Sequence, residues 1–276
     1  MKEQLLEAVR DAPDPAAALN LAREYLQARI LLALQEAGAM IPLALRGGTA
    51  LRFLFGLPRF SEDLDFALER PERGDLDIPR LAERVVAQLE REGYEVASRR
   101  KVDRVVQSIM VSFPGLLYDI GLAAEPSRRL NVRIEVDTKP PGGAGLATTV
   151  VRRQAVLNLQ HHDRPSLLAG KLHAVLERTW AKGRDWFDLF WYLSDPTWPA
   201  PNLVLLNNAL RQTGSGLLAL DEATWRRAVR DRLAVIDWIA VERDVTPFLE
   251  PGPTARILRR ESLLQVVSSE ASRSPT

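Results

Sequence analysis

The chain has 276 residues, of which 46% are apolar and 26% charged, and it is long enough for one large domain or two modest ones with a substantial core. Its formal net charge of only +1 excludes a protein that holds polyanions by overall charge. The lack of cysteine excludes disulfides, thiolate zinc sites and a cysteine nucleophile.

The sequence contains no segment typical of a signal peptide or a membrane span. The first residues, MKEQLLEAVRDAPD, place acids where a signal peptide needs an uninterrupted apolar run. No later apolar run approaches the roughly 18–20 residues that cross a bilayer. We therefore expect a soluble, cytoplasmic protein that does not associate with membranes.

In the first half of the chain, predicted helices alternate with short predicted strands. Apolar side chains recur at helical spacing in three segments, and a glycine ends or follows each of them. The predicted helices cover residues 15–38, 49–55 and 77–92. Short apolar or alternating segments predict strands. These strands cover residues 41–45, 64–68, 94–101, 105–113 and 130–138.

The second half of the chain has a mainly helical pattern. From about residue 165 the apolar residues follow helical spacing, with breaks at the loop 195–202 and near residues 214–216. The last residues, SSEASRSPT, lack apolar side chains and predict a frayed tail. We expect an N-terminal helical segment, a mixed α/β core, a helical C-terminal domain and a flexible tail. Their expected bounds are residues 1–40, 41–150, 151–267 and 268–276.

The segment RGGTALRFLFGLPRFSEDLDFAL, residues 46–68, carries the clearest chemical signal. Residues two apart on a strand point to the same face, about 6.5–7 Å apart, so Asp63 and Asp65 project together while Leu64 and Phe66 enter the core. Such carboxylates repel each other unless a cation lies between them. Mg²⁺ fits, because it prefers oxygen ligands and usually binds one or two carboxylates together with substrate phosphates.

A third carboxylate is expected from the predicted strand LNVRIEVDT. Its alternation places Arg133, Glu135 and Asp137 on one face. Glu135 has apolar neighbours on both sides and is the favoured partner of Asp63 and Asp65, with Asp137 as the alternative. Three carboxylates that hold one or two Mg²⁺ ions suit in-line nucleotidyl transfer, and one of them can accept the proton of the attacking hydroxyl.

Gly47, Gly48 and Thr49 predict the phosphate end of the same site. Two glycines allow the backbone to approach a ligand closely. Thr49 then starts a helix whose free N–H groups and dipole favour phosphate. A triphosphate between this helix start and the metal would relieve the repulsion among the acids. Ser61 is a candidate accessory residue, whose hydroxyl could orient Asp63 or be a modification target.

The order G-G-[ST], short helix, S-x-D-x-D resembles the core motif of nucleotidyltransferases of the polymerase β type. More closely, GGTALR followed by GLPRFSEDLDF resembles the AbiEii/AbiGii toxin family, densely over residues 46–68 and more loosely elsewhere. The resemblance implies an α+β fold, with a mixed sheet flanked by helices and a helical C-terminal half. It also implies a lysine on a helix, an arginine further along and the motif R-D-x-x-D-L.

The C-terminal half contains those residues in LLAGKLHAVLERTWAKGRDWFDLFWYL. Lys171 and Arg178 are seven apart and share a helix face, and Asp185 and Asp188 are three apart on the next predicted helix. The resemblance implies that Lys171 neutralises the triphosphate and that Arg178 helps to bind it. It also implies that Arg184 and Asp185 order the pocket, with Asp188 in support, and that Asp185 belongs to the catalytic set.

Together these residues predict Mg²⁺-dependent transfer of a nucleoside monophosphate from an NTP to an acceptor hydroxyl, with release of pyrophosphate. The resemblance implies a toxin of a toxin–antitoxin or abortive-infection system that modifies RNA, with the tRNA 3′ end as the expected acceptor, and so blocks translation. It implies a cognate antitoxin protein, or antagonism at the RNA level without direct contact. Four basic clusters are candidate RNA contacts, at residues 99–101, 128–129, 152–153 and 226–232.

Three other functions fit parts of the pattern. An antibiotic-modifying nucleotidyltransferase would act on a small-molecule hydroxyl, but its cationic drug would need an acidic pocket, which the arginine surplus disfavours. A protein that binds NTP or RNA without turnover would not need the intact acids. A kinase-like enzyme would transfer the γ-phosphoryl group instead.

Overall fold

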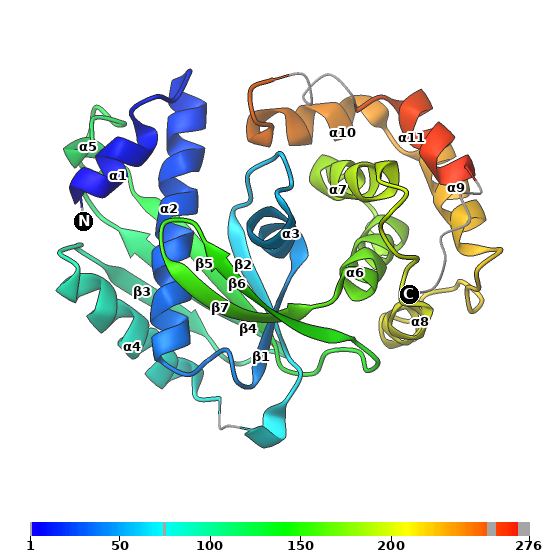
Figure 1. The fold of residues 1–276 in the computed structure, drawn as a ribbon, viewed down its shortest axis with the longest axis horizontal. Helices are drawn as coiled ribbons and strands as arrows, with labels where there is room; N and C mark the ends of the chain where they lie inside the picture. The colour runs from blue at the N-terminus through cyan, green and yellow to red at the C-terminus, as the bar shows by residue number, and fades with distance from the viewer. Residues whose placement is uncertain (1, 74–75, 253–257, 270–276) are drawn as a thin grey trace. The chain divides into compact units, whose positions relative to one another are not determined.

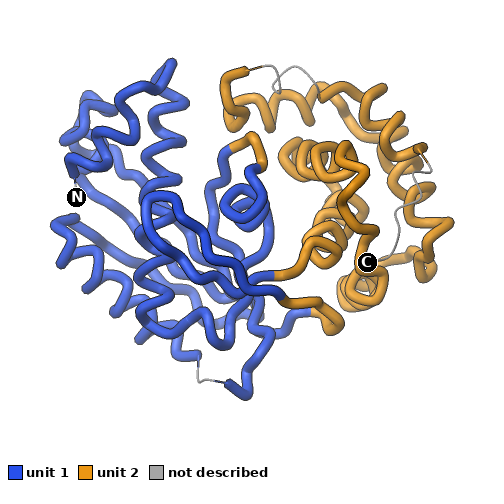
Figure 2. Tube along the Cα trace, in the orientation of Figure 1, with its two compact units in different colours: residues 1–56, 60–140, 147–161 blue, residues 57–59, 141–146, 162–276 orange. Residues whose placement is uncertain are grey.

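The computed structural model describes residues 2–73, 76–252 and 258–269, which fall into two compact units (Figure 2). The sheet unit comprises residues 1–56, 60–140 and 147–161, and the helical unit comprises residues 57–59, 141–146 and 162–276. Residues 270–276, which belong to the predicted tail, lie outside the described residues. No helix within the described ranges combines the length and the apolar character that a membrane span requires.

The sheet unit is built on one mixed sheet, whose strands lie in the order β3-β4-β5-β2-β1-β7-β6 (Figure 1). Strand β2 pairs in parallel with β5, and β1 with β7. The pairs β1–β2, β3–β4 and β4–β5 are antiparallel. The strands are β1 (Leu43–Arg46), β2 (Asp63–Leu68), β3 (Ala97–Lys101), β4 (Val106–Phe113), β5 (Leu130–Asp137), β6 (Leu146–Arg152) and β7 (Val156–His162). This mixed sheet, followed by a helical unit, confirms the predicted α+β class.

Helices α2 and α4 pack against each other and against strands β3, β4 and β5. Helix α2 begins where the Asp14 carboxylate accepts a hydrogen bond from the Ala17 N–H at 2.8 Å, with Pro15 in the first position. The helices of this unit are α1 (Lys2–Val9), α2 (Pro15–Glu36), α3 (Gly47–Phe55), α4 (Ile78–Arg91) and α5 (Leu116–Asp119).

The two faces of the sheet differ over strands β3, β4 and β5. Alternate residues of β4 and β5 are buried on the face that α2 and α4 cover, and they include Ile109, Val111, Val132 and Ile134. The residues between them are half-buried or exposed, because alternation sends their side chains to the opposite face. We call this opposite face the open face of the sheet, and it carries Ser108, Met110, Arg133 and Glu135.

Strands β6 and β7 were not among the predicted strands. Strand β7, VLNLQHH, mixes apolar and polar residues, and its polar Gln160 and His161 are buried as well. The Gln160 side chain donates to the Leu43 carbonyl at 3.0 Å, and His161 Nε2 lies 2.9 Å from Thr149 Oγ1. These partners lie in other parts of the chain, so the local pattern did not predict the strand.

The helical unit packs around α7, whose aromatic side chains Trp186, Phe187 and Tyr192 are buried, as the sequence WFDLFWYL predicts. Gly183 begins α7 in contact with α10, where any Cβ would collide with the Val241 carbonyl oxygen. The described helices of this unit are α6 (Arg164–Glu177), α7 (Gly183–Ser194), α8 (Leu203–Gln212), α9 (Trp225–Val235), α10 (Trp238–Val245) and α11 (Arg260–Ser268).

Candidate active site

The two aspartates of the S-x-D-x-D motif lie at the start of β2, on the open face. Leu64, between them, is fully buried, which leaves Asp63 and Asp65 half-buried on the opposite side. Strand β5 supplies the neighbours, because Asp63 pairs in register with Arg133 and Asp65 with Glu135. Residues directly opposite in a strand pair share a face, so the three carboxylates lie together on the open face.

We call this group of Asp63, Asp65 and Glu135 the acid cluster, and its surroundings favour the protonated form of Asp63. Burial and the charges of Asp65 and Glu135 raise the pKa of Asp63 to about 6, although Arg133 opposes them. The Arg133 guanidinium instead lies 3.2 Å from the Glu135 carboxylate. The acid cluster therefore carries more negative charge than the cation beside it balances.

Asp137, the alternative third carboxylate, has a different partner. In register it lies beside Ala67, one pair beyond Phe66 and two beyond Asp65. Its carboxylate forms an ion pair with Arg46 at 3.1 Å. Glu135 is thus the β5 acid beside Asp65, whereas Asp137 is held by a residue of β1.

The glycine turn lies directly against the acid cluster. Gly47 has φ +76°, a conformation that favours glycine, and a Cβ at this position would lie 2.5 Å from Asp65 Oδ2. Helix α3 begins at Gly47 after Arg46, and within the described residues no side chain caps this end. The free N–H groups of the first helical turn therefore lie next to Asp65.

Thr49 and Ser61 make contacts that the sequence did not predict. The Thr49 side chain is fully buried and its hydroxyl donates to the Asp63 carbonyl, so it ties α3 to β2 and does not face solvent. The Ser61 carbonyl accepts a hydrogen bond from Gln27 Nε2 at 3.0 Å, which fixes the segment before β2 to α2. The Thr49 backbone N–H, and not its hydroxyl, is the group available in the first turn of α3.

The metal prediction has support from donor chemistry, but the side chains do not form a ready-made site. The acid cluster offers oxygen donors, which Mg²⁺ prefers. In the part of the chain that the structure describes, no group of three or more Asp, Glu or His side chains converges closely enough to hold an ion. A metal ligand set of Asp63, Asp65 and Glu135 stays a prediction.

The predicted residues of the helical unit come together in a second charged group, which we call the ion-pair cluster (Arg59, Lys171, Arg178, Asp185 and Asp188). Lys171 Nζ lies 2.9 Å from Asp185 and 2.7 Å from Asp188. Arg178 Nε lies 3.0 Å from the other oxygen of Asp185. Asp185 and Asp188 both lie on α7 and contact Lys171, as predicted. The prediction that Lys171 and Arg178 share a helix face is wrong, because α6 ends at Glu177 and Arg178 follows it in an extended conformation.

Arg59 completes the ion-pair cluster, and sequence reasoning did not single it out. Its guanidinium donates two hydrogen bonds of 2.6 Å to the two oxygens of Asp188, and both side chains are buried. The only sequence signal was its position within GLPRF, part of the stretch that carries the family resemblance. Asp188 contacts Arg59 and Lys171, whereas the resemblance implied that it supports Arg184 and Asp185.

The pKa values of Lys171 and Asp185 in the ion-pair cluster shift toward their charged forms. Burial disfavours charge on Asp185, but Lys171, Lys182 and Arg178 outweigh it and lower the pKa of Asp185 to about 2. Burial likewise opposes charge on Lys171, yet Asp185 and Asp188 raise its pKa. Lys171 and Asp185 therefore remain ionised together.

Arg184 contacts residues of α10 and of the turn that follows it. Its backbone N–H donates to the Asp244 carboxylate at 3.1 Å, and its guanidinium stacks on the Phe248 ring at 4.1 Å. These contacts tie the start of α7 to α10 and the turn that follows it. The role of Arg184 in ordering a pocket together with Asp185 stays a prediction.

Comparison with known proteins places this geometry in a family. The chain matches the family model for the nucleotidyl transferase AbiEii toxin of type IV toxin–antitoxin systems over residues 29–262. No curated protein matches it. Among solved structures it resembles JHP933 from Helicobacter pylori, with 20% identity, a TM-score of 0.55, and coverage of 92% of this chain and 90% of that one.

A second similar structure is that of a candidate nucleotidyltransferase from H. pylori, with 21% identity, a TM-score of 0.53, and coverage of 91% of this chain and 92% of that one. At these identities the two structures show that the fold is shared. The family match spans the glycine turn, both charged clusters and most of the chain. The chain therefore belongs to the AbiEii family of nucleotidyltransferase toxins of type IV toxin–antitoxin systems.

Proposed function

We propose that this toxin transfers a nucleoside monophosphate from an NTP to a hydroxyl of RNA in a Mg²⁺-dependent reaction, with the tRNA 3′ end as the acceptor, and so blocks translation. The observation that carries the proposal is the acid cluster beside the free N-terminus of α3. Asp65 lies in register with Glu135 and against Gly47, so acids and backbone donors share one small region.

The acid cluster fits a hard cation for a physical reason. Burial and the charges of its neighbouring carboxylates raise the pKa of Asp63, and a divalent cation would relieve the repulsion among these carboxylates. Mg²⁺, when bound, would supply Lewis-acid polarisation of a phosphoryl oxygen. Asp63 and Asp65 would hold it, and Glu135 would complete the set or accept the proton of the acceptor hydroxyl.

The first turn of α3 is the proposed phosphate contact. The N–H groups of Gly47, Gly48 and Thr49 have no partner within an α-helix, because the first turn of a helix leaves its donors free. These donors and the helix dipole favour a phosphate there. Gly47 lies directly against the Asp65 carboxylate, so the proposed phosphate contact lies beside the proposed metal ligands.

Lys171, Arg178 and Asp185 remain proposed nucleotide-binding residues with a more restricted role. Lys171 already faces two carboxylates, so its charge is largely neutralised within the helical unit. Arg178 is about one-third exposed, and its guanidinium donates no hydrogen bond to another residue that the structure describes, so it is the better candidate for direct contact with a phosphate. Lys171 and Asp185 would then hold Arg178 in place.

A labelling experiment tests the proposal. The protein is incubated with each NTP, labelled with ³²P at either the α or the γ position, together with Mg²⁺ and total RNA. Label on tRNA from α-labelled but not γ-labelled nucleotide is expected. Transfer of the γ label alone would overturn the proposal in favour of a kinase-like reaction, and label on a small molecule but not on RNA would overturn the proposed acceptor.

Two variants make the result specific to the acid cluster. Asp65→Asn should reduce transfer by at least about 10³-fold, since a lost metal ligand removes several kcal/mol of transition-state stabilisation. The control is Glu83→Gln, which neutralises an exposed carboxylate on α4 that pairs with Arg100. Equal loss in both variants would show that the effect is not local to the acid cluster. Toxicity in cells should disappear with Asp65→Asn and persist with Glu83→Gln.

A further inference from the structure

Two rows of residues cross the open face of the sheet from the acid cluster to the edge strand β3. The first row runs from Asp65 through Glu135 and Ser108 to Lys101. The second row runs from Asp63 through Arg133 and Met110 to Arg99. Each step is a direct pair between neighbouring strands, so all members of a row share the open face.

Strand β3 has the sequence ASRRK, and alternation divides its three cations between the two faces. Arg100 pairs with Ile109 in register and lies on the helix-covered face, where it donates to the Pro79 carbonyl and to Glu83, each at 3.2 Å. Arg99 and Lys101 lie on the open face and are exposed. Among the residues that the structure describes, neither makes a hydrogen bond or ion pair through its side chain.

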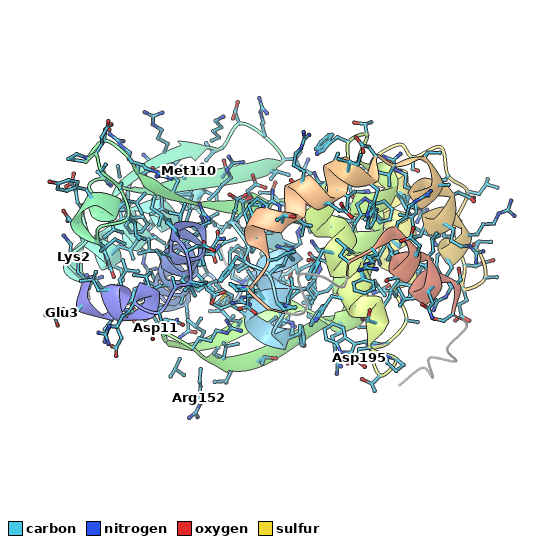
Figure 3. All side chains as sticks on the ribbon, turned by 90° about the horizontal axis from the view of Figure 1, so that it is seen from above. Lys2, Glu3, Asp11, Met110, Arg152 and Asp195 are labelled. Carbon is cyan, nitrogen blue, oxygen red and sulfur yellow. The ribbon has the colours of Figure 1, made fainter. Side chains whose placement is uncertain are left out.

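Two other arginines of the predicted basic clusters are already engaged. Arg153 binds the Glu24 carboxylate at 3.1 Å and the Arg52 carbonyl at 3.0 Å. Arg232 donates to the Val175 and Arg178 carbonyls. Arg152 is exposed, but Figure 3 shows it on the opposite side of the sheet unit from Met110. The strand order agrees, because β6 and β3 are opposite edges of the sheet.

We propose that Arg99, Lys101 and Arg133, which we call the basic track, bind the phosphates of the acceptor RNA strand and lead its 3′ end to the acid cluster. This inference rests on the proposed function, since it assigns a docking surface to the acceptor of that reaction. With strands about 4.8 Å apart, the track extends roughly 14 Å from Asp65 to β3. The position of Arg133, beside both Asp63 and Glu135, makes the track continuous with the acids.

The chemistry of the track indicates contact with the RNA backbone and not with bases. Exposed cations on a strand reach phosphates, and such contacts position a nucleic acid without reading its sequence. The central residues between the cations, Ser108 and Met110, are small or flexible and offer no aromatic surface for stacking. Binding through the track should therefore depend steeply on salt and little on sequence.

The test compares Arg99→Gln/Lys101→Gln with Arg100→Gln, a matched control on the same strand whose side chain lies on the other face. The probe is a fluorescein-labelled RNA hairpin with a single-stranded 3′ tail, titrated at KCl concentrations between about 50 and 200 mM. The double variant should bind about tenfold more weakly. The slope of log K against log [KCl] should fall in magnitude by about 1.4–1.8, at 0.7–0.9 per lost phosphate contact.

The transfer reaction gives a second readout. In the double variant the KM for RNA should rise about tenfold, whereas kcat and the KM for NTP should stay within about twofold, because Arg99 and Lys101 lie on β3, two strands away from Glu135. Arg100→Gln should match the wild-type protein in both assays. Equal effects of the two variants, or no change in the salt slope, would overturn the basic track.

The outcomes also separate this inference from the proposed function. Transfer of the α label to RNA with unchanged binding by the double variant would refute the track and leave the function standing. RNA binding that depends on Arg99 and Lys101, without any transfer, would support the track and refute the function. A wild-type protein that does not bind the hairpin would refute both.

Discussion

The two charged clusters are built from the same kinds of side chain, but the pKa of Asp63 in one and the pKa of Asp185 in the other shift in opposite directions. In the acid cluster, burial together with Asp65 and Glu135 raises the pKa of Asp63 to about 6. In the ion-pair cluster, burial acts the same way, but Lys171, Lys182 and Arg178 lower the pKa of Asp185 to about 2. The difference lies in the number of cations within reach of each carboxylate.

This contrast separates a cluster with excess negative charge from one whose carboxylates are paired with cations. In the ion-pair cluster each carboxylate is paired with at least one cation, although Arg178 Nε and Asp185 Oδ2 make no hydrogen bond within the described residues. The acid cluster keeps excess negative charge at a half-buried surface, and proteins commonly keep such unfavourable groups where function requires them. The clusters should therefore respond in opposite ways when a carboxylate is removed.

The largest effect on stability is expected from Asp188→Ala. The change leaves the buried Arg59 and Lys171 without a shared carboxylate, and breaking a buried ion pair from one side costs about 3–5 kcal/mol. Urea unfolding followed by tryptophan fluorescence measures the loss selectively, because all 6 tryptophans lie between residues 180 and 238 in the helical unit. A change below about 1 kcal/mol would contradict a compensated structural cluster.

In the acid cluster, Asp63→Asn should instead raise the free energy of unfolding. Removing the repelled carboxylate should stabilise the metal-free sheet unit at pH 7. The pKa of Asp63 rises from 3.8 to about 6, which corresponds to about 3 kcal/mol at most, and solvent at this half-buried group reduces the gain to about 1–3 kcal/mol. Calorimetry in the presence of a chelator measures the change. A less stable variant at pH 7 would contradict the contrast.

The pH dependence of that gain follows from linkage. Because the pKa of Asp63 is higher in the folded chain, the folded state binds more protons between about pH 4 and pH 6. The contribution of Asp63 to stability is therefore complete below about pH 4 and is lost as the pH rises through 6. The advantage of Asp63→Asn should shrink as the pH falls from 7 to 4, and excess Mg²⁺ at pH 7 should stabilise only the wild-type protein.

The sequence predicted the acid cluster better than the ion-pair cluster, for a physical reason. Strand alternation is local, so the common face of Asp63 and Asp65 follows from their spacing of two. Alternation does not fix the register between strands, which left Glu135 and Asp137 both open until the β2–β5 pairing placed Glu135 beside Asp65.

Contacts between distant segments have no local signal. Arg59 and Asp188 are 129 residues apart, and only the folded chain shows that they form a pair. A run of arginines in the sequence does not predict one basic surface, because neighbouring residues on a strand face opposite sides of the sheet, as Arg99 and Arg100 do. The buried polar residues of β7 concealed a strand for the same reason, since their partners lie elsewhere in the sequence.

Gly47→Ala is expected to have a smaller effect on stability. It changes the geometry of the site and leaves its charge the same. A positive φ costs a non-glycine residue roughly 1–2 kcal/mol, and the new Cβ would displace the Asp65 carboxylate. Gly38→Ala is the matched control, because Gly38 has φ +79° but nothing within 4 Å of a Cβ. Both variants should lose similar stability in thermal unfolding, and only Gly47→Ala should lose transfer activity by at least about tenfold. Equal activities would show that contact with Asp65 does not matter.

The smallest effect on stability is expected from Asp137→Asn, and it distinguishes the two acids of β5. Asp137 pairs with Arg46 at a partly exposed site, so its loss should cost at most about 1 kcal/mol and leave Mg²⁺ affinity within about twofold. Glu135→Gln should weaken Mg²⁺ binding by about tenfold or more, because Glu135 lies in register with Asp65. Isothermal titration of each variant with Mg²⁺ and a non-hydrolysable NTP measures both affinities. If Asp137→Asn weakened Mg²⁺ binding more than Glu135→Gln, the third carboxylate would be Asp137, and its pairing with Arg46 would have to break when the metal binds.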